Sequence, residues 1–351
     1  MDKLQQFIEN IRPLDEAAME KAQIRLNSLT KPLGSLGDLE SVVIQTAGAL
    51  KVIPDSLKKA VVLMAADHGV ACEQVSAYPQ EVTAQMVFNF VNGGAGINVL
   101  TKHAQSELVL VDVGVKIDLP ASLPIRHNKI RYGTNNIKFG PAMNRADAIA
   151  AIQTGISVAM SLIDEGTQII GLGEMGIGNT AVSSAVTSVL TGYSSAEVTG
   201  KGTGLSDNLL MHKINIIQQA INVNRPNPDD VIDVLTKIGG LEIAALTGVA
   251  LAGAYRRVLI VMDGFIASTA AYAAYRLCPI VKDYLIAAHQ SPEPGHKIIL
   301  QELGLKPMLN LHMCLGEGTG AALGMTLLDA GLKVFNGMST FDQAKISYIT
   351  D

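Results

Sequence analysis

Five short segments of almost purely aliphatic residues most constrain what this chain can fold into. They are Val61–Ala66, Leu108–Val113, Gln168–Gly171, Val258–Met262 and Tyr284–Ala288. A strand that is exposed on one face alternates apolar and polar residues, whereas these segments are apolar on both faces, which is typical of a buried parallel sheet. The sequence therefore predicts an α/β fold with a Rossmann-like parallel sheet flanked by helices.

The stretches between these segments carry apolar residues at spacings of three and four, the periodicity of a helix that packs on one side. The expected crossover helices are Val82–Leu100, Arg145–Glu165, Thr180–Val189, Asp207–Asn222 and Gly264–Leu277. The two ends of the chain have helical patterns and no strand. We therefore expect an α/β domain over residues 56–330 and a small helical domain built from residues 1–55 and 331–351.

Composition and charge exclude several classes of protein. The chain is 48% apolar and 17% charged, with a formal net charge of −5 and no dense basic cluster, so nucleic acid is not an expected partner. Its most apolar stretch, Ile243–Ala274, is interrupted by Arg256, Arg257 and Asp263, which predicts core elements rather than a membrane span. The start of the sequence lacks the pattern of a signal or transit peptide, and the expected location is the cytoplasm.

No metal, disulfide or cofactor is expected from the cysteines and histidines. The three Cys are far apart and form no C-x-x-C pair, and the seven His are scattered without an H-x-x-x-H pattern. His68 and His289 follow predicted strands and are better explained as hydrogen-bonding residues than as metal ligands.

Polar residues follow each predicted strand. Asp67 and His68 follow the first, Asp112 ends the second, Glu174 follows the third, Asp263 the fourth, and His289 with Ser291 the fifth. Ligands of open parallel sheets bind at the carboxyl ends of the strands. Five such ends together predict a site there, although an Asp or Ser at one end can simply cap a helix.

Two glycine-rich loops predict a phosphate site. Gly171–Gly176 matches G-x-G-x-x-G, but no acidic residue ends a second strand about 20 positions later, as a dinucleotide fold requires. What remains is a loop that leads into a helix at Gly178, Asn179 and Thr180, and such a helix start suits a phosphate. The second loop, Gly200–Gly204, precedes a helix that contains Lys213.

A third motif places a carboxylate between glycines at the start of a small-residue helix. Glu317 is flanked by Gly316 and Gly318 and preceded by the apolar Leu315. An apolar wall raises the pKa of a carboxyl group towards use as a general base, whereas a helix N-terminus lowers it. The motif alone leaves open which effect is larger.

Five motifs carry a resemblance to a known family. They are Leu29–Gly37, Ala66–Val70, Gly173–Thr180, Asp263–Phe265 and Leu315–Ala322. In order and in sequence they closely resemble the nicotinate-nucleotide–dimethylbenzimidazole phosphoribosyltransferases, which make the lower-ligand nucleotide of cobalamin. The resemblance implies transfer of the phosphoribosyl group of nicotinate mononucleotide to 5,6-dimethylbenzimidazole or a related base. Inversion at the anomeric carbon would give α-ribazole 5′-phosphate and nicotinate.

The resemblance also implies roles for individual residues. Glu317 is the expected catalytic base. The expected nucleotide and phosphate site comprises Glu174, Gly176, Gly178, Asn179, Thr180, Gly202, Gly204, Lys213, Asp263 and Ser291. The expected base pocket comprises Tyr78, Pro79, Gln85, Met86 and Leu315. A homodimer is implied, with the partner subunit helping to wall the site.

The base pocket departs from the family pattern at two positions. Tyr78 stands where well-characterised members carry Ser, and Met86 where they carry Gln. This predicts a more apolar pocket with fewer small polar contacts and leaves the preferred base open. Two alternatives remain open on sequence alone: a nucleotide-binding oxidoreductase, suggested by the G-x-G-x-x-G match, and a non-catalytic binding protein of corrinoid metabolism.

Overall fold

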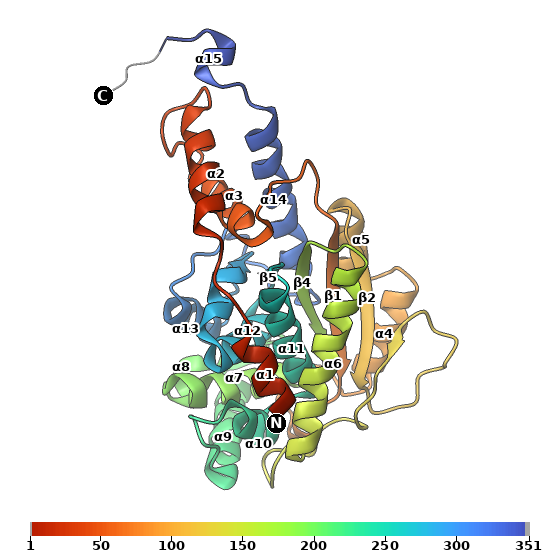
Figure 1. Ribbon diagram of the computed structural model, residues 1–351. Coiled ribbons are helices and arrows are strands. Elements are labelled where there is room, and N and C mark those ends of the chain that lie inside the picture. Colours follow the sequence, from red (N-terminus) through yellow and green to blue (C-terminus); the bar gives the residue numbers. More distant parts are fainter. Residues whose placement is uncertain (1, 348–351) are drawn as a thin grey trace.

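The fold is built on one six-stranded parallel sheet (Figure 1). The computed structural model describes residues 2–347. The strands are β1 (Lys59–Ala66), β2 (Glu107–Gly114), β3 (Arg126–His127), β4 (Ile169–Met175), β5 (Leu259–Met262) and β6 (Leu285–Ala287). Their order is β3-β2-β1-β4-β5-β6, and every pair is parallel. This is the strand order of doubly wound nucleotide-binding folds, so the predicted Rossmann-like architecture is confirmed.

Helices cover the sheet and extend beyond it. They are α1 (Asp2–Glu9), α2 (Glu16–Ser28), α3 (Asp38–Leu50), α4 (Val82–Val91), α5 (Gly96–His103), α6 (Arg145–Asp164), α7 (Asn179–Thr191), α8 (Ser195–Val198), α9 (Asp207–Asn224), α10 (Val231–Ile238), α11 (Leu241–Tyr255), α12 (Phe265–Leu277), α13 (Pro294–Leu303), α14 (Thr319–Gly337) and α15 (Phe341–Ala344), with 3-10 turns at Gly69–Glu73 and Pro279–Tyr284. Every residue of β1, β5 and β6 is buried, as expected of a sheet with helices on both faces.

The five predicted strands are confirmed to within a few residues, but one predicted helix is wrong. The stretch 82–100 is two helices, because α4 ends at Val91 and α5 starts at Gly96. Gly93, between them, has φ +76°, a left-handed conformation that breaks the helix. The short edge strand β3 was not predicted, because two residues carry no periodic pattern.

A small helical unit lies at one end of the molecule. In Figure 1, α2 and α3 stand beside the C-terminal part of α14, above the sheet. Gly331 of α14 approaches Leu39 and Val43 of α3 closely enough that an added Cβ would lie 3.1–3.2 Å from them. Two details differ from the proposed division of the chain. Helix α14 runs without a break through positions 330 and 331, and α1 packs on α11 instead, where Phe7 stacks on Tyr255.

Among residues 2–347, one helix, α6, is long and apolar enough to cross a membrane by length and composition alone. In the fold it packs along α11, another strongly apolar helix, on the sheet domain. At two points the helix backbones come very close. An added Cβ at Gly155 of α6 would lie 1.7 Å from the Ala245 carbonyl oxygen, and one at Gly248 of α11 2.0 Å from that of Ile152.

Candidate active site

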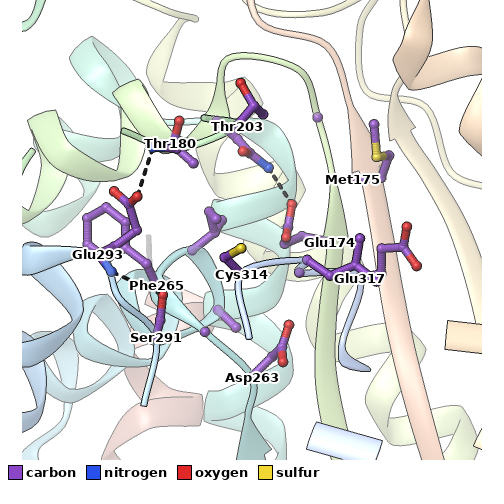
Figure 2. Close-up of a pocket in the computed structure, with 18 of the residues that line it drawn as sticks. Glu174, Met175, Thr180, Thr203, Asp263, Phe265, Ser291, Glu293, Cys314 and Glu317 are labelled. Carbon is purple, nitrogen blue, oxygen red and sulfur yellow. Dashed lines mark hydrogen bonds between the residues drawn. The ribbon is translucent and has the colours of Figure 1, made fainter. Parts of the chain in front are cut away.

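A cavity of about 390 Å³ opens at the carboxyl ends of β4, β5 and β6. Glu174 at the end of β4, Asp263 after β5, and His289 with Ser291 after β6 all line it. Glu317, in the loop before α14, lines the same cavity, so three of these side chains carry carboxyl groups. In Figure 2, Thr180, Glu293 and Ser291 lie on one side of the cavity, and Met175 and Glu317 on the other.

The first side has the character of an anion site. Helix α7 starts at Asn179, and its N-cap, Gly178, has φ +95°, which a residue with a side chain rarely adopts. Gly176, Gly178, Asn179 and Thr180 all border the cavity. The positive end of the helix dipole at this point favours a bound phosphate.

Lys213 supports this side from behind the lining. Its side chain is fully buried, and its Nζ donates to Thr180 Oγ1 at 2.9 Å and to the Gly200 carbonyl at 3.2 Å. Burial lowers the pKa of Lys213 to about 8, an effect that the nearby Glu293 carboxylate opposes. Glu293 accepts a hydrogen bond from the Gly202 N–H at 2.8 Å and so ties the second glycine loop to the start of α13.

Glu174 stands between the two sides of the cavity. It is buried, and its Oε2 accepts a hydrogen bond from the Asn179 side-chain amide. Burial, and then the neighbouring carboxylates of Asp263 and Glu242, raise the pKa of Glu174 to about 8. Glu174 therefore holds a proton at neutral pH and can donate as well as accept hydrogen bonds.

Glu317 is a buried carboxyl group in a strained backbone conformation. Its φ is +63°, between Gly316 at +82° and Gly318 at +88°. A left-handed conformation at a residue with a side chain costs about 1–3 kcal/mol and is typical of functional sites. Glu317 Oε2 accepts a hydrogen bond from the Ile97 N–H at the start of α5, at 3.2 Å.

The pKa of Glu317 answers the question that the sequence left open. Burial raises it, the Ile97 hydrogen bond opposes that rise, and the carboxylate of Asp263 adds to it. The helix N-terminus that faces the carboxylate belongs to α5, not to α14, which follows Glu317 in the chain. A carboxyl group with a raised pKa is a stronger base than an ordinary one, which suits proton abstraction.

The second side of the cavity is mostly apolar. Tyr78 comes from the segment before α4, and Val82 and Met86 come from the first turns of α4 itself. Met175 and Leu315 also line the cavity. Val82 and Met86 are four residues apart on α4 and share a helix face. The lining can therefore hold a flat apolar ring beside Glu317.

Comparisons with known proteins decide the family. The family model DBI_PRT, described as Phosphoribosyltransferase, matches residues 11–346. The chain belongs to this family. It is 48% identical to the nicotinate-nucleotide–dimethylbenzimidazole phosphoribosyltransferase of Geobacter metallireducens, over 99% of this chain and 98% of that protein. It is 51% identical to the enzyme of the same name from Desulforudis audaxviator, over 99% of each chain.

Solved structures of this phosphoribosyltransferase family have the same fold. The crystal structure of CobT from Thermus thermophilus superposes with a TM-score of 0.91 at 40% identity, covering 95% of this chain and 100% of that one. A second structure from the same organism, named as the phosphoribosyltransferase, gives a TM-score of 0.90 at 40% identity, with 96% of this chain and 100% of that one covered. The resemblance stated from the motifs is confirmed over nearly the whole chain.

The structure brings most of the predicted site residues of this phosphoribosyltransferase to one cavity. The lining includes Tyr78, Met86, Glu174, Gly176, Gly178, Asn179, Thr180, Gly202, Asp263, Ser291, Leu315 and Glu317. Lys213 lies behind the lining, and Gly204, Pro79 and Gln85 are outside it. Gln85 is exposed because it lies about 100° around α4 from Met86.

The structure also corrects two details of the motif analysis. Gly171 and Gly173 lie inside β4, so the G-x-G-x-x-G match is not a phosphate loop and no longer favours an oxidoreductase. Glu293 was missed, because a single acidic residue between two prolines has no sequence pattern that marks it.

Among residues 2–347, no three His, Cys, Asp or Glu side chains come together in a way that could hold a metal ion.

Proposed function

We propose that this chain transfers the phosphoribosyl group of nicotinate mononucleotide to 5,6-dimethylbenzimidazole or a related base. The products are nicotinate and α-ribazole 5′-phosphate, the nucleotide of the cobalamin lower ligand. Membership of the family along the whole chain carries this proposal. The cavity supports it, since one space joins an anion site to an apolar pocket beside a buried carboxylate.

The arrangement suits a direct displacement at the anomeric carbon. The phosphate binds at the start of α7, where Gly176 to Thr180 border the cavity, with Lys213 behind. The incoming base lies between Met86 and Leu315, next to Glu317. Its ring nitrogen forms the new bond to C1′ as the bond to nicotinate breaks, and the bonding electron pair leaves with the nicotinate ring.

Glu317 takes the proton that the base loses in this step. A neutral benzimidazole carries its N–H proton into the product unless a base removes it, and the raised pKa of Glu317 suits this transfer. Attack from the side opposite nicotinate inverts the anomeric centre, so no covalent enzyme intermediate is required.

We further propose that the enzyme is a homodimer in which a second subunit covers the mouth of the cavity. Tyr78 is 55% exposed and Leu315 is 58% exposed, although both line the site. Large apolar side chains left open at a binding site favour coverage by a ligand or by a second copy. Size measurement in solution with and without both substrates tests this, and a monomer under both conditions would refute it.

The function is tested by mixing the purified protein with nicotinate mononucleotide and 5,6-dimethylbenzimidazole. We expect nicotinate and α-ribazole 5′-phosphate to form in equal amounts. Binding of the mononucleotide without turnover would instead indicate a non-catalytic corrinoid-pathway protein. Stabilisation by a nicotinamide dinucleotide, and not by the mononucleotide, would indicate an oxidoreductase.

A further inference from the structure

We infer that Asp263 is a positioning residue, which acts on the reaction by holding the loop that carries Glu317. This inference rests on the proposed function of Glu317 as the base. It differs from the expectation that Asp263 serves the nucleotide directly.

Both carboxylate oxygens of Asp263 accept hydrogen bonds from backbone N–H groups that follow Glu317 in the chain. Oδ2 accepts a hydrogen bond from the Gly318 N–H at 3.0 Å, and Oδ1 accepts one from the Gly320 N–H at 2.7 Å. His289 Nε2 lies 3.3 Å from Oδ1 and adds a third contact. Asp263 is 2% exposed, so these contacts form in a nearly dry environment, where charge-assisted hydrogen bonds are strong.

The position of these two N–H groups gives the contacts their importance. Gly318 is the N-cap of α14 and the residue directly after Glu317, and Gly320 lies in the first turn of the helix. Asp263, which follows β5, therefore supplies the hydrogen-bond acceptors that the N–H groups at the start of α14 need. Gly320 has room for no side chain here, since an added Cβ would lie 2.0 Å from His289 Cδ2 and 2.7 Å from Asp263 Oδ1.

The loop is held from a second side by β4. An added Cβ at Gly173 would lie 2.7 Å from the Glu317 carbonyl oxygen, so the loop backbone rests directly on that strand. The left-handed conformation of Glu317 persists only when its surroundings enforce it. With β4 on one side and Asp263 on the other, the carboxylate of Glu317 is fixed against the Ile97 N–H.

A second aspartate at the same edge of the sheet gives a matched comparison. Asp112, at the end of β2, accepts hydrogen bonds at Oδ1 from the N–H groups of Gly114 and Val115, at 3.0 and 2.9 Å. It is also 2% exposed. Its two amides belong to the last residue of β2 and to the residue after it, and neither they nor Asp112 line the cavity. Asp112→Asn therefore removes a similar capping carboxylate without touching the site.

The charge of Asp263 affects the pH dependence of kcat, which a purely structural role would leave unchanged. The other ionisable side chains that line the cavity with Glu317 are Tyr78, Glu174, Asp263, His289, Glu293 and Cys314. The Asp263 carboxylate contributes to the raised pKa of Glu317. Asp263→Asn removes this negative charge, so the pKa of Glu317 falls and the acidic limb of the kcat profile moves to lower pH.

The test compares Asp263→Asn with Asp112→Asn in the full chain, measuring kcat and both KM values against pH. For Asp263→Asn we expect kcat to fall about 10²-fold, as for a misplaced base, with the KM for nicotinate mononucleotide changed less than about twofold and the acidic limb moved down. Asp112→Asn should keep the wild-type kcat and the wild-type position of the acidic limb in the pH profile of kcat. A raised KM for the mononucleotide with unchanged kcat would overturn the inference, and so would equal effects of the two variants.

A second variant separates geometry from charge and serves if Asp263→Asn does not fold. Gly320→Ala drives a methyl group against Asp263 and His289 while every charge stays in place. We expect kcat to fall while the acidic limb of its pH profile stays where it is in the wild type. A wild-type kcat would contradict the positioning role. Failure of the wild-type protein to release nicotinate at all would refute the proposed function instead.

Discussion

The carboxyl ends of β4, β5 and β6 and those of β1 and β2 carry similar polar residues, but these lie in different surroundings. On the first side, Glu174, Asp263 and Ser291 border the cavity. On the second, His68 Nε2 contacts Glu242 Oε1 at 2.7 Å, with both side chains fully buried, and Asp67 Oδ2 accepts a hydrogen bond from the Lys116 N–H at 2.8 Å. A polar strand end marks a functional site only when its side chain faces open space.

The physical difference lies in what covers each half of the edge. The ends of β1 and β2 are covered by the chain itself, because the N-terminus of α11 brings Glu242 onto His68 and the segment after β2 brings Lys116 onto Asp67. The ends of β4 to β6 are covered by glycine loops, which leave room for a ligand. Substitutions on the two sides should therefore have different consequences: activity on one, stability on the other.

Glu317→Gln should have the largest effect on activity. The amide keeps the size of the side chain and can still accept the Ile97 hydrogen bond, but it cannot take a proton. We expect turnover to fall by about 10²- to 10⁴-fold while the fold and the Kd for nicotinate mononucleotide stay nearly unchanged. Steady-state kinetics with a binding titration measure both, and near wild-type turnover would remove Glu317 from its role.

Glu242→Ala is the counterpart on the other half of the edge. Removing the Glu242 carboxyl group leaves His68 without this partner in a fully buried position, and an unsatisfied buried polar group costs about 1–3 kcal/mol. We expect this loss in the free energy of unfolding, measured by denaturant titration. An unfolding midpoint equal to that of the wild type would show that the two halves do not differ as described.

How far the sequence predicts this molecule depends on the kind of signal. Aliphatic runs such as Val61–Ala66 predict the buried strands well, because two-sided burial demands them. Helix α11 is apolar all round and so lacks the one-sided pattern that marks a helix. The partners of Asp263 also escape prediction, because its hydrogen bonds reach residues more than 50 positions away, at Gly318 and Gly320.

Glu174→Gln should change how the stability of the protein depends on pH. Because the pKa of Glu174 is raised from 4.5 to about 8 in the fold, the folded state binds more protons than the unfolded state between these values. The wild type therefore loses stability as pH rises through that window, and the neutral variant does not. We expect the variant to be more stable at pH 8, by a few kcal/mol at most, with no difference in acid. Melting temperatures against pH test this, and parallel curves would contradict it.

The double variant Tyr78→Ser and Met86→Gln should have the smallest effect. Both side chains line the cavity, and neither belongs to the start of α7. We expect a several-fold change in the ranking of bases by kcat/KM, towards bases with more polar edges, because one or two contacts in an apolar pocket discriminate weakly. A panel of benzimidazoles, purines and phenols measures this, and an unchanged ranking would exclude these residues from base selection.

In the proposed reaction, one cavity brings the base and the nucleotide together for direct displacement, with Glu317 taking the proton. The anomeric configuration of the product, determined by NMR from a single turnover, tests it most directly. Direct attack opposite the leaving nicotinate predicts the α-ribotide alone. A β-ribotide would require two successive displacements through an intermediate and would contradict this account.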